Sequence, residues 1–155
     1  MSMDDSEPVT VDTVLAPVDG SDESATAVEY AVAVADRYDA SVHVLYVLGR
    51  GVVRGMDVGT VDEAAVAENS QGFLEDVSRI ADQRDVSLST SIDDGFSQTR
   101  KTRHPGNVVL DTADDVDADF IVLPREPVSD AASAEVLEKV AEYVLSYASQ
   151  PVLSV

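Results

Sequence analysis

The chain contains no cysteine and no tryptophan, and lysine and arginine together supply only 10 of its 155 residues. Without cysteine, disulfide bonds and thiolate metal sites are excluded. No window of about 18 apolar residues occurs, so we expect no membrane-spanning segment. The opening residues, MSMDDSEPVT, are acidic and polar with no apolar core. We interpret residues 1–10 as a disordered acidic tail and residues 11–155 as one folded domain of a cytoplasmic protein.

Negative charge dominates the sequence. Asp and Glu number 30 against 10 Lys and Arg, which gives a net charge of -20. The acids are spread along predicted helix surfaces, which suits a halophilic protein, because high salt screens self-repulsion. A field of this sign opposes general affinity for nucleic acid. The acids match no EF-hand spacing, so we expect no metal site.

Strand and helix patterns alternate along the chain. Apolar and β-branched runs predict strands at residues 12–18, 40–48, 86–92, 120–123 and 151–155. Apolar residues at helical spacing predict helices at 21–39, 61–84, 107–116 and 134–148. Such alternation predicts an α/β, Rossmann-like fold, in which helices cover both faces of a five-stranded parallel sheet.

Three local features refine this pattern. Pro17 lies in the first strand, which should be central, so we place it near the strand's end, where a missing donor costs little. Residues 86–92 alternate with period two, which predicts an edge strand with one polar face. Residues 49–59, GRGVVRGMDVG, contain several glycines, and we predict a loop there.

Both ends of the chain resemble the universal stress protein family. The opening TVLAPVDGSDESATAVEYAVAVA has that family's apolar strand, Pro-Val-Asp-Gly-Ser turn and alanine-rich helix. The end, VLEKVAEYVLSYASQPVLSV, is similar to the family's last helix and strand. The resemblance implies the strand order 3-2-1-4-5 and a homodimer formed by pairing of the last strand, Val152–Val155. That short apolar strand carries no charge to protect its edge, which agrees with the second implication.

The resemblance fails where ATP-binding relatives hold phosphate. Those relatives carry glycine, two residues, glycine, nine residues, then glycine and serine or threonine. Counting back from VAEYVL places Arg125 and Val128 at the first two glycines, and Glu138 and Lys139 at the last two positions. Side chains would fill the space where backbone amides meet phosphate. A Glu138 carboxylate about 4 Å from a phosphate charge would add repulsion of roughly 4 kcal/mol. We therefore expect no ATP bound through the usual loop.

The adenine end of that site is better preserved. The resemblance implies that Asp19, after the first strand, borders adenine and that the backbone of Val47 contacts the base. Asp19 has a second interpretation, because Asp-Gly-Ser is a strong turn signal in which Asp bonds nearby backbone. We expect no cofactor, with ATP or AMP as the alternative.

Six of the ten cations follow predicted strands, at the sheet edge where open α/β folds bind ligands. They indicate an arginine-lined anion site, a docking surface for an acidic partner, or simple pairing with nearby carboxylates. Part of the group lies in the loop Phe96–Gly106, which looks longer than its family counterpart. Besides Arg125, the anion-binding candidates are Arg50, Arg54, Arg100, Lys101, Arg103 and His104.

Catalytic motifs are missing from the sequence, with no Gly-x-Ser-x-Gly, His-Glu-x-x-His or Walker A spacing. His43 lies inside the second predicted strand, where we interpret it as a core or face residue, and His104 has no visible partner. We predict a regulatory or protective dimeric binding protein, not an enzyme. The alternative is an adenine-nucleotide-binding protein, perhaps a slow hydrolase, whose arginines hold the phosphate.

Overall fold

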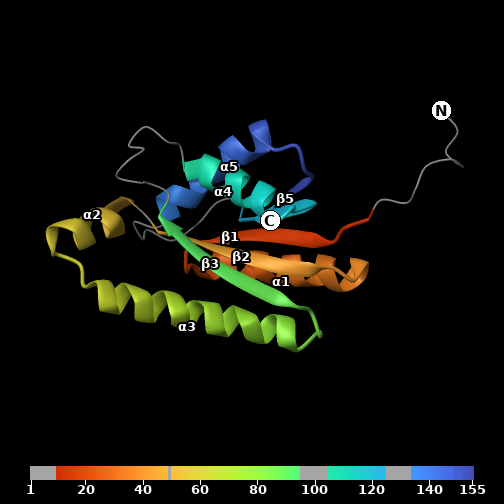
Figure 1. Cartoon of the computed structure of the whole chain (residues 1–155), viewed down its shortest axis with the longest axis horizontal. Coiled ribbons are helices and arrows are strands. Elements are labelled where there is room, and N and C mark those ends of the chain that lie inside the picture. The colour runs from red at the N-terminus through yellow and green to blue at the C-terminus, as the bar shows by residue number, and fades with distance from the viewer. Residues whose placement is uncertain (1–9, 49, 95–104, 125–133) are drawn as a thin grey trace, which may run out of the picture.

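The computed structural model describes residues 10–48, 50–94, 105–124 and 134–155 (Figure 1). Of the predicted tail, residues 1–9 lie outside these ranges. Within them, no helix has the length and hydropathy needed to cross a bilayer. The elements are β1 (Thr13–Val18), α1 (Asp22–Tyr38), β2 (Ser41–Leu48), α2 (Arg50–Val58), α3 (Glu63–Asp82), β3 (Leu88–Asp94), α4 (Pro105–Asp115), β4 (Phe120–Leu123), α5 (Ala134–Tyr147) and β5 (Val152–Ser154).

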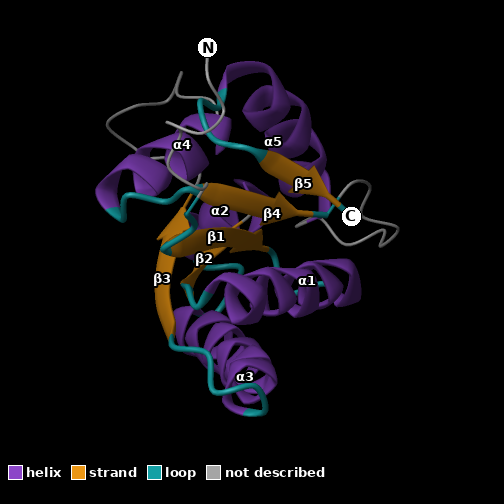
Figure 2. Cartoon of the chain, turned by 90° about the vertical axis from the view of Figure 1, so that its right-hand side faces the viewer, coloured by secondary structure: helices purple, strands orange, loops and turns teal. Residues whose placement is uncertain are grey.

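The five strands form one parallel sheet in the order β3-β2-β1-β4-β5. Helices α1 and α3 cover one face, and α4 and α5 cover the other (Figure 2). The predicted fold class and strand order are therefore confirmed. β3 lies at one edge of the sheet, as its period-two pattern predicted, and β5 lies at the other.

Alternate residues of β1 supply the two layers of the core. Val14, Ala16 and Val18 belong to the cluster beneath α1 and α3, and Leu15 belongs to the cluster beneath α4 and α5. All four are fully buried, which is typical of a central parallel strand covered on both faces. Pro17 lies beyond the β1–β4 ladder, which pairs only residues 14 and 15 of β1, so its missing N–H leaves no gap there. Its predicted place near the end of the strand is confirmed.

Residues 50–58 form helix α2, so the loop predicted over residues 49–59 is wrong for most of its length. The glycines of this segment allow close packing and end the helix. A side chain on Gly55 would overlap Val61, and the Gly55 carbonyl accepts the N–H groups of Thr60 and Val61 at 2.8 and 2.9 Å. Gly59, with φ +79°, turns the chain out of the helix. Glycine here marks close packing and a helix end.

Helix α3 is shorter than its predicted span of 61–84. Asp62 caps its N-terminus, because the Asp62 side chain accepts the N–H of Ala64 at 3.0 Å. Ala64 and Ala67, which the apolar spacing of the sequence places on the buried face of this helix, are exposed. Figure 1 shows the reason: the first turns of α3 project past the end of the sheet. Burial begins further along, at Ser70, Leu74, Val77 and Ala81.

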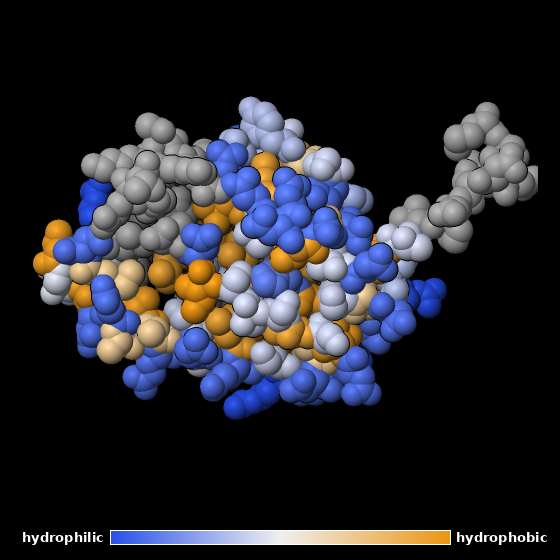
Figure 3. All heavy atoms as spheres, viewed as in Figure 1, coloured by the Kyte–Doolittle hydropathy of each residue, from blue (hydrophilic) through white to orange (hydrophobic). Residues whose placement is uncertain are grey.

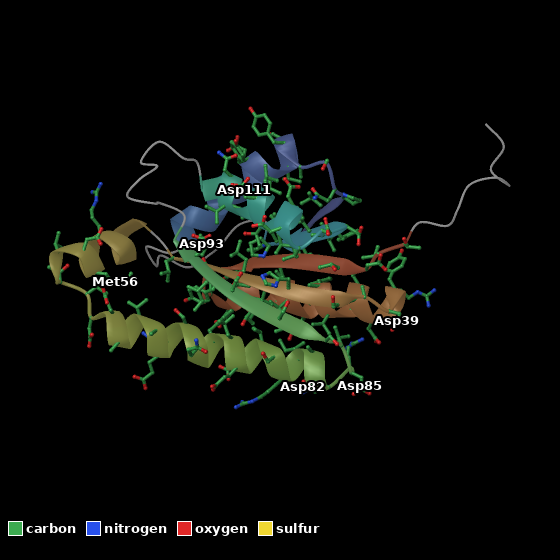
Figure 4. The ribbon with its side chains drawn as sticks, in the orientation of Figure 1. Asp39, Met56, Asp82, Asp85, Asp93 and Asp111 are labelled. Carbon is green, nitrogen blue, oxygen red and sulfur yellow. The ribbon has the colours of Figure 1, made fainter. Side chains whose placement is uncertain are left out.

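Three helices end in the same unusual way. After α1, α3 and α4 an aspartate takes a left-handed conformation, and the next residue donates its N–H to an alanine carbonyl five positions back. This is the Schellman arrangement, which ordinarily uses glycine at the left-handed position. Figure 4 labels two of the aspartates, Asp39 and Asp85, at one end of the molecule. The aspartates are Asp39, Asp85 and Asp117 (φ 56°, 53° and 53°), and the bonds are Ala40 to Ala35, Val86 to Ala81 and Ala118 to Ala113, at 2.8, 3.0 and 2.8 Å.

Candidate functional site

Asp19 follows β1 at the carboxyl edge of the sheet and is only 3 % exposed. Its Oδ1 accepts the backbone N–H of Ser21 at 2.9 Å, which confirms the turn-forming interpretation. Its Oδ2 is buried and has no hydrogen-bond partner among the described residues. An unpaired buried acceptor costs on the order of 1–3 kcal/mol. One carboxylate oxygen is thus used by the turn, while the other keeps an unused capacity to accept a hydrogen bond.

The turn at Asp19 is fixed from the neighbouring strand. The Tyr46 hydroxyl donates to the Asp19 carbonyl at 3.3 Å, and its ring meets that of Phe73 edge-on at 5.8 Å. Gly20 has φ +87°, and a side chain there would collide with the Tyr46 hydroxyl. Burial raises the pKa of Tyr46; a hydrogen bond with Ser70 opposes this rise and the Asp19 charge adds to it. Asp19 is therefore held by a rigid, well-packed support.

Val47 is fully buried and contributes its side chain to the core beneath α4 and α5. Val18 pairs in register with Tyr46, so the residues that follow them, Asp19 and Val47, reach the same edge of the sheet. The structure thus brings together the two positions that the resemblance assigned to adenine.

The other predicted site residues divide into three groups. The described Arg54 is exposed and lies on α2, not in a loop after β2 as expected; the backbone of Arg50 also belongs to α2. Glu138 and Lys139 lie within α5, but their side chains are outside the described part of the structure. Arg100, Lys101, Arg103, His104, Arg125 and Val128 lie outside the described residues altogether.

His43 lies on β2 and is half-buried, in agreement with its interpretation as a face residue. Its Nδ1 is 2.7 Å from the Ser89 hydroxyl, and its Nε2 is 2.8 Å from the Ser91 hydroxyl. Burial lowers the pKa of the imidazole from its usual 6.5. Sequence reasoning missed these partners because they are 46 and 48 residues away along the chain. The sequence feature that could have indicated them is the Ser-x-Ser spacing in the predicted edge strand, which puts both serines on one face of the sheet.

Acidic residues border cavities on both sides of the sheet in the described part of the structure. One, of about 770 Å³, runs between α1 and α3 from Gly20 past Phe73 and is bordered by Asp22, Glu68 and Asp76. The other, of about 400 Å³, lies between β3 and α4, whose Asp93 and Asp111 are labelled in Figure 4. Carboxylates of this density repel anions. The described residues include no group of three or more His, Cys, Asp or Glu side chains suited to holding a metal ion.

Comparisons with known proteins agree on one family. The model of the universal stress protein family matches residues 10–155. Universal stress protein MJ0531 of Methanocaldococcus jannaschii is 28% identical over 145 residues, covering 92% of this chain and 80% of that protein. The structure of UspA from Lactobacillus plantarum superposes with a TM-score of 0.68 at 22% identity, over 95% of this chain and 99% of the other. The universal stress protein from Archaeoglobus fulgidus in complex with dAMP gives 0.60 at 18% identity, over 94% and 98%.

Proposed function

The chain belongs to the universal stress protein family, and on that premise we propose that it is a regulatory or protective binding protein that acts without catalytic turnover. We place it in the cytoplasm as a homodimer. Its ligand site is the carboxyl edge of the sheet around Asp19, where open α/β folds bind ligands.

The observation that carries this proposal is the buried Oδ2 of Asp19, for which the described ranges of the chain provide no hydrogen-bond partner. It favours a ligand with an N–H donor aimed at the end of β1, such as the amino group of a purine base. The relative bound to dAMP supports the same class of ligand. Adenine-nucleotide binding, with arginines near the phosphate and slow hydrolysis, is therefore the second candidate function.

At the phosphate end of the site, the sequence differs from that of ATP-binding relatives. Arg125, Val128, Glu138 and Lys139 replace the small residues that would bring backbone amides to a triphosphate. Because Glu138 adds a negative charge to a site that also carries Arg125 and Lys139, it offsets part of their attraction for phosphate, and we expect further phosphates to add little affinity. We propose that any nucleotide bound here is held chiefly by its base, and that ATP is not held through the usual loop.

Calorimetric titration with adenosine, AMP and ATP–Mg²⁺ tests these statements. We expect no saturation by ATP–Mg²⁺ at micromolar concentration, and such saturation would contradict the proposed loss of the loop. If adenosine or AMP binds, Asp19→Asn should weaken binding by at least about tenfold, since a bond to a charged acceptor contributes roughly 1.5–3 kcal/mol. Asp93→Asn, at the same edge on β3, is the matched control and should leave binding unchanged. Nucleotide detected by mass spectrometry in the purified protein would favour the second candidate.

The free edge of β5 is the proposed dimer contact. The Pro151 carbonyl accepts from Ile121, and the N–H of Val155 donates to Leu123, so these odd-numbered residues face β4. Residues 152 and 154 therefore direct their backbone groups outward, where a second copy can pair with them. Ser154→Pro removes an outward donor, and we expect it to halve the mass measured by light scattering. Ser154→Ala keeps the donor and should remain dimeric; a dimeric proline variant would contradict the proposed contact.

A further inference from the structure

One cluster of nucleophilic and titratable side chains lies apart from the Asp19 site. β3 runs along the sheet edge (Figure 1), and the surface on that side of the molecule mixes pale residues of intermediate hydropathy with hydrophobic ones (Figure 3). Leu45 and Val47 on β2 belong to the core beneath α4 and α5, and His43 lies on the same face because it alternates with them. His43 pairs in register with Ser89, and Leu45 pairs with Ser91. The parallel register therefore puts one imidazole beside two serine hydroxyls.

The geometry is that of a nucleophile, a base and a group that orients the base. Distances of 2.7 Å to Ser89 and 2.8 Å to Ser91 are within hydrogen-bonding reach at both ring nitrogens. A neutral imidazole has one donor nitrogen and one acceptor nitrogen. When Nε2–H donates to Ser91, Nδ1 is left to accept the Ser89 proton. Ser91 is then a positioning residue, and the Ser89 oxygen is the one made nucleophilic.

Exposure selects between the two serines. Ser89 is exposed, whereas Ser91 is half-buried, so a reagent from solvent reaches Ser89 more easily. Half-burial of His43 also favours its neutral form, which is the form able to accept a proton. The same burial that makes His43 look structural therefore keeps it available as a base.

We propose that Ser89 is a modification site that accepts an acyl group from an activated donor, a carboxylic ester, acyl phosphate or thioester. The Ser89 Oγ forms a bond to the acyl carbon while the bond between that carbon and the leaving group breaks. His43 Nδ1 takes the hydroxyl proton and passes it to the leaving group or to solvent. The product is a stable acyl-serine on the edge strand, formed once per chain. This inference does not depend on the proposed ligand site at Asp19.

The test uses the full-length protein and p-nitrophenyl acetate, with acetylated residues located by peptide mass spectrometry. Ser146, an exposed serine whose hydroxyl donates to the Glu142 carbonyl at 3.0 Å, is the internal control. Because a positioned base typically contributes about 10²-fold or more, we expect Ser89 to react at least about tenfold faster than Ser146 even on this open surface. Unfolding in urea should remove the difference.

Variants separate the roles of the three residues. His43→Gln should lower the rate at Ser89 by about tenfold or more and leave Ser146 unchanged, so a general effect on folding is recognised within the same molecule. Ser91→Ala should slow Ser89 less, and Ser91→Thr, which keeps the hydroxyl, should restore the rate. Equal rates at Ser89 and Ser146, faster labelling of Ser91, or an unaltered Ser89 rate in His43→Gln would each overturn the proposal.

Discussion

Three aspartates stand where helix geometry disfavours them, and this leads to a quantitative prediction about salt. Asp39, Asp85 and Asp117 each follow the last turn of a helix in the left-handed conformation. A helix C-terminus carries partial negative charge, so a carboxylate there is repelled. Asparagine adopts the left-handed region readily and has the same shape. Replacing all three aspartates by asparagine therefore changes charge while it preserves the Schellman bonds.

The size of the effect follows from the dipole interaction. Each charge at a helix end is worth roughly 0.3–1 kcal/mol at low ionic strength. All three side chains are exposed, and Arg84, bonded to Asp36 at 3.4 Å, already supplies positive charge near the ends of α1 and α3. We therefore expect the triple variant to raise the free energy of unfolding by about 1–2 kcal/mol at about 0.1 M KCl. The gain should shrink towards zero at about 2 M KCl, because the Debye length falls from about 10 Å to under about 3 Å.

Urea unfolding followed by circular dichroism at both salt concentrations measures this difference. The matched control is Glu29→Gln/Glu68→Gln/Glu142→Gln, which removes the same number of charges from exposed positions inside helices. Both variants relieve general self-repulsion equally, so only their difference reports the helix ends. A triple asparagine variant no more stable than the control at low salt, or a gain that persists in high salt, would refute the reasoning.

Three further predictions concern single residues. Burial lowers the pKa of His43 below 6.5, so as pH falls the unfolded chain binds a proton at this residue before the folded chain does. We therefore expect wild type to lose stability relative to His43→Gln as pH drops below 6.5. Urea unfolding of both proteins across that pH range measures this difference. The Asp119 Oδ2 accepts the N–H groups of Asp12 and Thr13 at 2.8 and 3.1 Å, and Asp119→Ala should lower the free energy of unfolding by about 2 kcal/mol. Gly20→Ala should destabilise by about 1–3 kcal/mol in the same assay, and adding Tyr46→Phe should recover only the steric part, since φ +87° still penalises a side chain.

Local periodicity was enough to predict a parallel sheet and the boundaries of most elements, because each strand and helix buries a face that the sequence marks. The order of the strands in the sheet came from the family resemblance, not from periodicity. The sequence did not predict helix α2, because its glycines are typical of loops, although Gly55 permits close packing against Val61 and Gly59 ends the helix. The three helix ends were visible as ADRYDA, ADQRDV and ADDVDA, a repeated Ala-Asp-x-x-Asp pattern. The predicted ends at residues 39, 84 and 116 lie close to the observed ends, but aspartate as the terminating residue was not predicted, because a left-handed terminator is expected to be glycine.

For the candidate sites too, local features were predictable from the sequence and contacts between distant residues were not. The turn role of Asp19 was predictable, because the Asp-Gly-Ser signal is local, and its place beside Val47 followed from the resemblance. Neither could show that one oxygen is enclosed without a partner, since that depends on side chains from several elements. The contacts of His43 with Ser89 and Ser91 require the register of β2 against β3, which a single sequence does not specify. The chemistry of a single turn can be predicted from the sequence, whereas contacts between residues on different strands can be predicted only when the register of the sheet is known.

The positions of the acidic residues suggest a physical mechanism for adaptation to high salt. That the protein is halophilic stays a prediction. A negative surface alone explains why such a chain tolerates salt, because screening weakens repulsion between all its charges. Aspartates at the ends of α1, α3 and α4 add a specific salt requirement, since there each carboxylate opposes a helix dipole as well as its neighbours. Wild type should therefore gain stability between about 0.1 M and 2 M KCl, and the triple asparagine variant should gain less. If both gain equally, the salt dependence belongs to the whole surface and the helix ends contribute nothing to it.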